Sequence, residues 1–240
     1  MDEVAGTASS LLQVEDAHTY YGESHILEGV SLEVGEGEVV ALIGRNGAGK
    51  TTTLRTVLQL TPPREGSVRY RGEELVGMRT HEVAERGVGW IPEERRVFSQ
   101  LTVEENVRIA VPKDGDGDAA LERVYGTFPD LGERSAAKAG TLSGGQQQML
   151  AIARGLVGEN DLLLVDEPSE GLAPQIVASV ADAIADAARE TTVLLVEQNL
   201  PLAMDLSDRF YLRDNGRVVR SGESTAGLGD DEEIRRYLSA

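Results

Sequence analysis

The amino-acid sequence predicts an α/β domain built on a mostly parallel sheet. Three short, nearly uninterrupted apolar runs alternate along the chain with segments of helical spacing. Apolar runs of this kind are typical of strands that are buried on both faces, and such strands belong to parallel sheets. The runs are residues 39–43, 161–165 and 192–196, and the helical segments begin at Lys50 and cover residues 174–188 and 200–206. Repeated strand–loop–helix units form a sheet that helices cover.

The chain ahead of the first buried run has a different pattern. Residues 1–10 are small and polar, and we expect them to be disordered. From Leu11 to Val34, apolar residues recur at short spacing and are interrupted by Gly22 and Gly29, which predicts β-strands. We therefore expect residues 11–240 to form a single domain whose parallel core is preceded by further strands.

The middle of the chain predicts helices. Thr102 and Glu105 have the spacing of a capping box, in which each residue bonds the backbone of the other at a helix start. Ser143 is suited to cap a second helix, and a Gly- and Asp-rich segment lies between the two. We interpret residues 95–155 as a helical insertion in the α/β core.

Composition excludes several kinds of function. The 240 residues include 23 basic and 41 acidic side chains, and the net charge of −18 disfavours binding to nucleic acid or anionic membrane surfaces. The absence of cysteine excludes disulfides, thiolate metal sites and cysteine nucleophiles. No apolar run approaches the roughly 20 residues of a membrane-spanning helix. The acidic start, Met1-Asp2-Glu3, does not resemble a secretion signal.

A glycine-rich loop follows the first buried run. Residues 44–51 read GRNGAGKT and fit the phosphate-binding pattern G-x4-G-K-[ST] between a predicted strand and a predicted helix. Glycines let successive N–H groups surround an anion, and the helix N-terminus adds positive potential. Lys50 can reach the β- and γ-phosphates and Thr51 can hold Mg²⁺. The residues expected to bind nucleotide are Gly44, Asn46, Gly47, Ala48, Gly49, Lys50, Thr51 and Thr52. We expect the helix to stop at Pro62-Pro63.

Two adjacent carboxylates, Asp166 and Glu167, follow the second buried run. The alternation of a strand would point them in different directions, which suits two separate tasks. One carboxylate can accept from the Mg²⁺ shell, and the other can orient an attacking water. The three histidines have no partners at metal-binding spacing, so the only metal expected is the Mg²⁺ that accompanies a nucleotide.

The segment 142–146, LSGGQ, is the third motif. Taken alone, it reads as a helix N-cap with two flexible glycines. Beside a phosphate loop it reads as a second anion-binding helix start, in which a serine hydroxyl and glycine N–H groups face a phosphate. The residues expected to bind in this way are Ser143, Gly144, Gly145 and Gln146.

In the chain the phosphate loop comes first, LSGGQ second and Asp166-Glu167 third. In this order and spacing, the three motifs resemble those of the ATP-binding-cassette (ABC) ATPases over residues 11–238. The resemblance implies a P-loop NTPase of the RecA-like type, in which a mostly parallel core carries an N-terminal antiparallel β subdomain and an inserted α-helical subdomain. It also implies that ATP binds with Mg²⁺, that Asp166 serves the metal and that Glu167 orients water. A second ATPase subunit would complete each site with its own LSGGQ segment.

Several single positions can be compared with the family. Tyr21, with Tyr20 as the alternative, stands where the family places an aromatic ring on adenine. Glu93 stands where the family usually has a glutamine that senses Mg²⁺ and the transporter. Gln198 replaces the usual histidine that contacts the γ-phosphate, and Ala173 stands where aspartate is commoner. The resemblance thus adds Glu93 to the metal site and Gln198 to the catalytic residues, beside Lys50.

Segments that include the positions departing from the usual family pattern indicate a particular subgroup of the family. Residues 91–98 (IPEERRVF), 146–152 (QQQMLAI), 169–174 (SEGLAP) and 196–199 (VEQN) are similar to the F-type ATPase of branched-chain amino-acid importers. This implies a protein on the cytoplasmic face of the cell membrane, bound to transmembrane permease subunits and served indirectly by a solute-binding protein. The second ATPase subunit is then either the same chain or a G-type relative. Urea or amide importers use a similar subunit and form the alternative.

Two other classes of protein are weighed against this reading. A non-transport cassette ATPase usually carries tandem cassettes, coiled-coil arms or basic surfaces, whereas this chain has one cassette and a net charge of −18. A small kinase or GTPase would lack the LSGGQ segment, and the chain has no Asn-Lys-x-Asp motif for reading guanine.

Overall fold

The computed structural model describes residues 10–224 and residue 234. Of the segment 1–10, expected to be disordered, only Ser10 is described, and it begins a strand. The strands are β1 (Ser10–Tyr21), β2 (Ser24–Gly35), β3 (Val39–Gly44), β4 (Glu65–Tyr70), β5 (Glu73–Glu74), β6 (Val88–Ile91), β7 (Leu162–Asp166), β8 (Thr192–Glu197), β9 (Arg209–Asp214) and β10 (Arg217–Glu223). The helices are α1 (Lys50–Val57), α2 (Thr80–Ala84), α3 (Val103–Arg108), α4 (Gly117–Thr127), α5 (Pro129–Gly132), α6 (Gly144–Val157), α7 (Pro174–Ala187) and α8 (Leu200–Leu206), with a 3-10 turn at Ala139–Thr141.

The strands form two sheets. One has six strands in the order β10-β9-β3-β8-β7-β6, and every neighbouring pair in it is parallel except β9 with β10. The other has four strands in the order β2-β1-β4-β5, all antiparallel. The predicted α/β class and mostly parallel core are therefore confirmed, as is the antiparallel sheet at the N-terminal side.

The six-stranded sheet is covered on both faces, as its three apolar runs predict. Every residue of β3, β7 and β8 is buried. Along β3, Val40 and Leu42 pack with the antiparallel sheet and α1, whereas Ala41 and Ile43 pack with α8 and β9. Because side chains alternate between faces, one uninterrupted apolar strand serves two separate cores.

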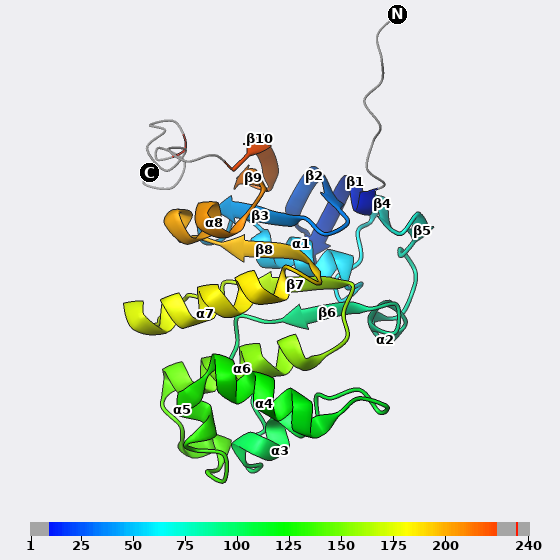
Figure 1. Cartoon of the computed structure of the whole chain (residues 1–240). Helices are drawn as coiled ribbons and strands as arrows, with labels where there is room; N and C mark the ends of the chain where they lie inside the picture. The colour runs from blue at the N-terminus through cyan, green and yellow to red at the C-terminus, as the bar shows by residue number, and fades with distance from the viewer. Residues whose placement is uncertain (1–9, 225–233, 235–240) are drawn as a thin grey trace, which may run out of the picture.

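Figure 1 shows how these layers are arranged. The four-stranded sheet stands at one end of the molecule beside β3, and α1 lies between it and the larger sheet. Helices α3 to α6 gather at the opposite end, beyond β6. In the chain they follow β6 and precede β7, so a single helical excursion separates two neighbouring strands.

The helix starts expected in this excursion are present. The Thr102 hydroxyl accepts from the Glu105 N–H, and the Glu105 carboxylate accepts from the Thr102 N–H. Ser143 and Gln146 form the same reciprocal pair at the start of α6. Each pair satisfies backbone donors that a helix start otherwise leaves free.

One helix ends earlier than the sequence predicts. We expected the helix after the phosphate loop to run to Pro62-Pro63, but α1 ends at Val57. The reason is Gln59, whose φ of +58° is in the left-handed region that terminates helices. Its side-chain amide donates to the Thr56 carbonyl at 2.7 Å and holds this turn in place. Among the described residues, no helix has the length and hydropathy needed to cross a bilayer.

Candidate nucleotide site

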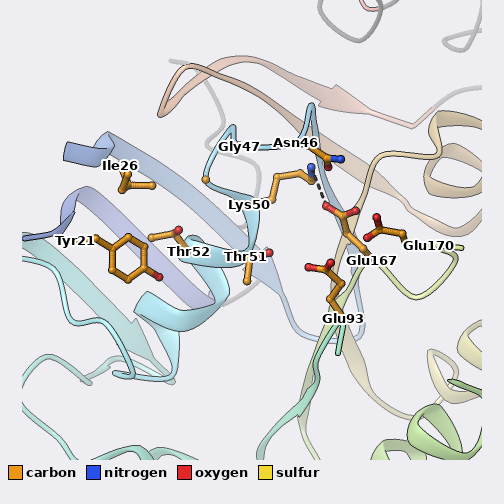
Figure 2. Close-up of a pocket in the computed structure, with 11 residues that line it drawn as sticks. Tyr21, Ile26, Asn46, Gly47, Lys50, Thr51, Thr52, Glu93, Glu167 and Glu170 are labelled. Atoms are coloured by element: carbon orange, nitrogen blue, oxygen red, sulfur yellow. Dashed lines mark ion pairs between the residues drawn. The ribbon is translucent and has the colours of Figure 1, made fainter. Parts of the chain in front are cut away.

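A cleft of about 400 Å³ lies where β3 and β7 end and α1 begins. Figure 2 shows the side chains that face it, with Tyr21 on one side and three carboxylates on the other. The lining residues are Tyr21, Ile26, Asn46, Gly47, Gly49, Lys50, Thr51, Thr52, Glu93, Glu167 and Glu170. Most of the residues expected to bind nucleotide, from β1 to the start of α1, are thus brought to one cleft.

The phosphate loop has the backbone that its glycines predict. Gly47 and Gly49 have φ of +81° and +87°, in the left-handed region that suits glycine. Gly49 is the N-cap of α1, and no side chain caps the helix there. The N–H groups of the first turn consequently remain available to an anion, at the end of the helix dipole that favours negative charge.

Lys50 is the cation of this cleft. Its side chain is 3% exposed, and its ammonium donates to the carbonyl oxygens of Gly44 at 2.7 Å and Arg45 at 3.0 Å. Its third partner is the Glu167 carboxylate, with Nζ 3.0 Å from Oε1. An ammonium has three protons, so a bound phosphate must replace one of these partners.

Asp166 is the last residue of β7, and it continues the strand's alternation on the face toward α1. Its Oδ1 accepts a hydrogen bond from the Thr51 hydroxyl at 3.1 Å. Burial raises the pKa of Asp166 to about 7; the hydrogen bond from Thr51 opposes the shift, and the charges of Glu167 and Glu93 add to it. The Lys50 charge also opposes the shift, but no basic side chain in the described part of the chain forms an ion pair with Asp166.

The residues around Asp166 fit a magnesium ion. The second carboxylate oxygen, Oδ2, is buried and has no hydrogen-bond partner among the described residues. Glu93, Glu167 and Glu170 line the adjacent cleft, where Lys50 is the one basic side chain among the described lining residues. Oxygen donors and an excess of negative charge are what Mg²⁺ requires.

Glu167 reaches the cleft because the strand ends at Asp166. Strand alternation would have turned the two carboxylates apart, but Glu167 has a φ of +44° and leaves the strand geometry. Its N–H donates to the Val196 carbonyl of β8 at 2.9 Å, which fixes the turn. The two carboxylates therefore serve neighbouring partners, Thr51 and Lys50.

The two candidate adenine-stacking tyrosines have different surroundings. Tyr21 lines the cleft and is 43% exposed, with Arg55 over its ring at 5.9 Å. Tyr20 is stacked on His25, with ring centroids 4.1 Å apart, and Arg64 covers it at 4.4 Å. Tyr21 thus presents a free aromatic surface to the cleft, whereas Tyr20 is occupied by its neighbours.

Glu197 is a buried carboxylate that sequence reasoning did not single out. It is 2% exposed at the end of β8. Its Oε1 accepts from the Ser169 N–H at 3.1 Å, and its Oε2 accepts from the N–H groups of Gln198 and Asn199 at 3.1 and 3.0 Å. Burial is the largest cause that raises its pKa, and the Glu167 charge adds to it. Glu197 therefore joins the loop after Glu167 to the loop that carries Gln198.

Two further side chains line the cleft, and one residue expected to act there, Gln198, does not. Ile26 and Glu170 line the cleft and were not assigned to it from the sequence. Glu170 lies in the loop 169–173, which the sequence comparison did single out. Gln198 is exposed, and its side chain makes no hydrogen bond to the rest of residues 10–224. It does not line the cleft.

The LSGGQ residues also lie outside the cleft lining. Ser143 is the N-cap of α6, and its hydroxyl accepts from the Gln146 N–H at 3.3 Å. Gly144 and Gly145 open the helix, where a Cβ would collide with Arg95 and Ile176 respectively. One chain thus holds a phosphate loop and an LSGGQ helix start in separate places.

A family model described as ABC transporter matches residues 27–170, which is more than half of the chain. The chain belongs to the ABC transporter ATPases. It is 45% identical to the high-affinity branched-chain amino acid transport ATP-binding protein BraG of Pseudomonas aeruginosa, over 95% of this chain and 99% of that protein. It is 36% identical to the probable branched-chain amino acid transport ATP-binding protein LivF of Archaeoglobus fulgidus, over 88% and 92%.

The fold of this ABC ATPase agrees with that of solved relatives. The ATP-binding subunit of an ABC transporter superposes with a TM-score of 0.79 and 31% identity, covering 96% of this chain and 95% of that one. The P-loop NTPase fold expected from the motifs is confirmed, and so is the resemblance to ATPases of branched-chain amino-acid transport. This ABC ATPase binds and hydrolyses ATP as a transport ATPase.

Proposed function

We propose that this ABC ATPase is the motor subunit of an importer for branched-chain or related amino acids, on the cytoplasmic face of the cell membrane. The observation that carries the proposal is the 45% identity to BraG along nearly the full length of both chains. In this role the subunit binds transmembrane permeases, and a solute-binding protein delivers the amino acid to them. ATP-driven closure of two ATPase subunits moves the permeases.

The residues of the cleft have separate tasks in this proposal. Tyr21 stacks on adenine, and residues 44–52 hold the phosphates through backbone N–H groups and Lys50. Thr51, Asp166 and Glu93 would hold Mg²⁺, which supplies charge neutralisation at the β- and γ-phosphates. The unpartnered oxygen of Asp166 and the surrounding carboxylates support this assignment.

Glu167 and Gln198 act on hydrolysis. Glu167 orients the attacking water and accepts its proton once phosphate binding releases the carboxylate from Lys50. Gln198 donates its amide N–H to the γ-phosphate. These roles require both residues to lie beside the γ-phosphate when ATP is bound.

A second ATPase subunit completes each site. The separation of LSGGQ from the phosphate loop within one chain supports a head-to-tail pair, in which Ser143, Gly144, Gly145 and Gln146 face the phosphates bound by the second subunit. That subunit is either another copy of this chain or a G-type relative.

Reconstituted transport tests the proposal. The chain would be co-expressed with candidate permeases from the same genome, inserted in proteoliposomes and supplied with the solute-binding protein. We expect ATP-dependent uptake of radiolabelled leucine, and no uptake with Lys50→Ala, which removes the cation of the phosphate loop. Uptake of urea without leucine would contradict the substrate assignment. If the chain bound none of the permeases, the motor role would be contradicted.

A further inference from the structure

Arg213 lies directly behind the phosphate loop, although no motif includes it. In the register of the sheet it is the β9 partner of Gly44, the residue at which the loop begins. A Cβ at Gly44 would lie 2.6 Å from the Arg213 carbonyl oxygen. The start of the loop therefore packs against the β9 backbone at this residue.

The side chain of Arg213 reaches the other end of the same loop. Its Nη1 donates to the Gly49 carbonyl at 2.7 Å and also to the Thr53 hydroxyl. The Thr53 hydroxyl donates to the same Gly49 carbonyl at 3.1 Å. Arg213 thus contacts the loop at its first and last glycines, and it fixes the carbonyl that precedes Lys50.

The charge of Arg213 is buried and unbalanced. The residue is 1% exposed, and its Nε and Nη2 have no hydrogen-bond partner in the part of the chain that the structure describes. No carboxylate within residues 10–224 forms an ion pair with Arg213. Burial lowers its pKa to about 10, so the guanidinium stays charged at neutral pH. An unpaired buried cation is costly for a folded protein.

The buried charge of Arg213 lies close to the nucleotide cleft. Gly49 lines the nucleotide cleft, whereas Arg213 does not, so the glycine separates the guanidinium from the cleft. The medium between them is protein rather than water, in which a charge acts over a longer range. An anion held by the loop N–H groups would offset the cost of burying Arg213.

We propose that Arg213 is a positioning residue that shapes the phosphate loop and, through its buried charge, raises the affinity of the cleft for the more highly phosphorylated nucleotides. The inference rests on ATP binding at residues 44–52. This role differs in one respect from that of a residue that only holds the loop in shape. Such a residue would support every nucleotide equally, whereas a charge favours ATP over ADP and ADP over AMP.

Nucleotide titrations by calorimetry distinguish an electrostatic role of Arg213 from a purely structural one. The test uses the full chain without Mg²⁺ at fixed ionic strength and compares Arg213→Gln, which keeps a donor for Gly49, with Arg213→Lys, which keeps the charge. We expect Arg213→Gln to raise the Kd of ATP about tenfold, with a smaller change for ADP and the smallest for AMP. Arg213→Lys should stay within about threefold of the wild type.

A matched control lies on the same strand. Arg209 is paired with Glu38 and Tyr211 and lies outside the cleft, so Arg209→Gln should leave all three affinities unchanged. An equal loss for ATP, ADP and AMP in Arg213→Gln, or no loss at all, would overturn the inference. Failure of the wild type to bind ATP would instead refute the nucleotide site itself.

A second measurement applies if Arg213→Gln does not fold. The ratio of ATP to AMP affinity would then be followed from pH 7 to pH 10 in Arg213→Lys and in the wild type. A buried lysine loses its proton at lower pH than a buried arginine. We expect the ratio to fall with pH more steeply in the lysine variant. Parallel profiles would count against a role for the charge.

Discussion

Lys50 and Glu167 form a buried ion pair across the nucleotide cleft, with Nζ 3.0 Å from Oε1 and the two side chains 3% and 9% exposed. The pair joins the cation of the phosphate loop to the carboxylate that we assign to water activation. The other two protons of Lys50 go to the Gly44 and Arg45 carbonyls. We propose that phosphate binding and release of Glu167 are one exchange, in which the phosphate takes the place of the carboxylate on Lys50.

Glu167→Gln tests this exchange. The neutral amide cannot accept a proton from water, and we expect ATP hydrolysis to fall by at least about a hundredfold. It also ends the ion pair, so MgATP should bind as tightly as in the wild type or more tightly. Size-exclusion chromatography with MgATP should show a stable dimer. Glu170→Gln is the matched control, because Glu170 lines the same cleft without contacting Lys50. Hydrolysis at the wild-type rate in Glu167→Gln would remove Glu167 from the chemistry.

Gln198→Ala tests the γ-phosphate contact. Loss of one positioned donor is expected to lower kcat by about ten- to a hundredfold and to leave ATP affinity nearly unchanged. Gln198→His should retain substantial activity, because an imidazole offers a donor at a similar reach. The measurement is steady-state ATPase activity of the permease-bound protein. If Gln198 only points to solvent, as its exposure allows, Gln198→Ala will hydrolyse ATP at the wild-type rate.

Glu197→Gln tests the link between two loops. In the variant, the glutamine NH₂ group would face backbone N–H groups that donate to the Glu197 carboxylate in the wild type. We expect a loss of about 1–3 kcal/mol in the free energy of unfolding, measured in urea. We also expect a lower kcat with an unchanged Kd for ATP, because Gln198 loses its fixed position. Glu190→Gln, at an exposed carboxylate, should change neither quantity. An unchanged kcat in Glu197→Gln would separate this residue from catalysis.

Asp166 predicts a pH dependence of stability in Mg²⁺-free protein. Its pKa is raised from 3.8 to about 7, so between these values the folded state binds a proton that the unfolded chain releases. The stability from this group is therefore greatest at low pH and falls as pH rises toward 7. Urea midpoints in EDTA, from pH 5 to pH 8, should show Asp166→Asn gaining on the wild type. A constant difference between the two would contradict the shift, and Asp130→Asn is the exposed control.

Much of this fold could be predicted because its signals are local. Val39–Gly44 is apolar throughout and is buried throughout, and Gly47 and Gly49 of the phosphate loop stand where a left-handed backbone occurs. The capping pairs at Thr102 and Ser143 depend on residues three apart, so sequence spacing was enough to find them.

Two of the missed features depend on contacts between distant segments. Arg213 and Gly49 meet only because β9 pairs with β3, and nothing near either residue in the chain indicates the contact. Glu197 was within a segment that the sequence comparison had noted, but its burial and its bond to Ser169 follow from the sheet. The early end of α1 arose from the backbone angle of Gln59, for which its sequence context gave no signal.

The strand order of the large sheet has a consequence for how the chain is made. β3, which carries the phosphate loop, pairs with β8 and β9 in the described sheet, and both are among the last strands in the sequence. During synthesis, β3 leaves the ribosome long before either partner, so both of its backbone edges are unpaired and its apolar side chains are uncovered. Its pairing closes a long loop of chain, which is a slow step in folding. We therefore expect a nascent chain that stops before Thr192 to lack both strands that hold β3, and with it the phosphate loop, in place.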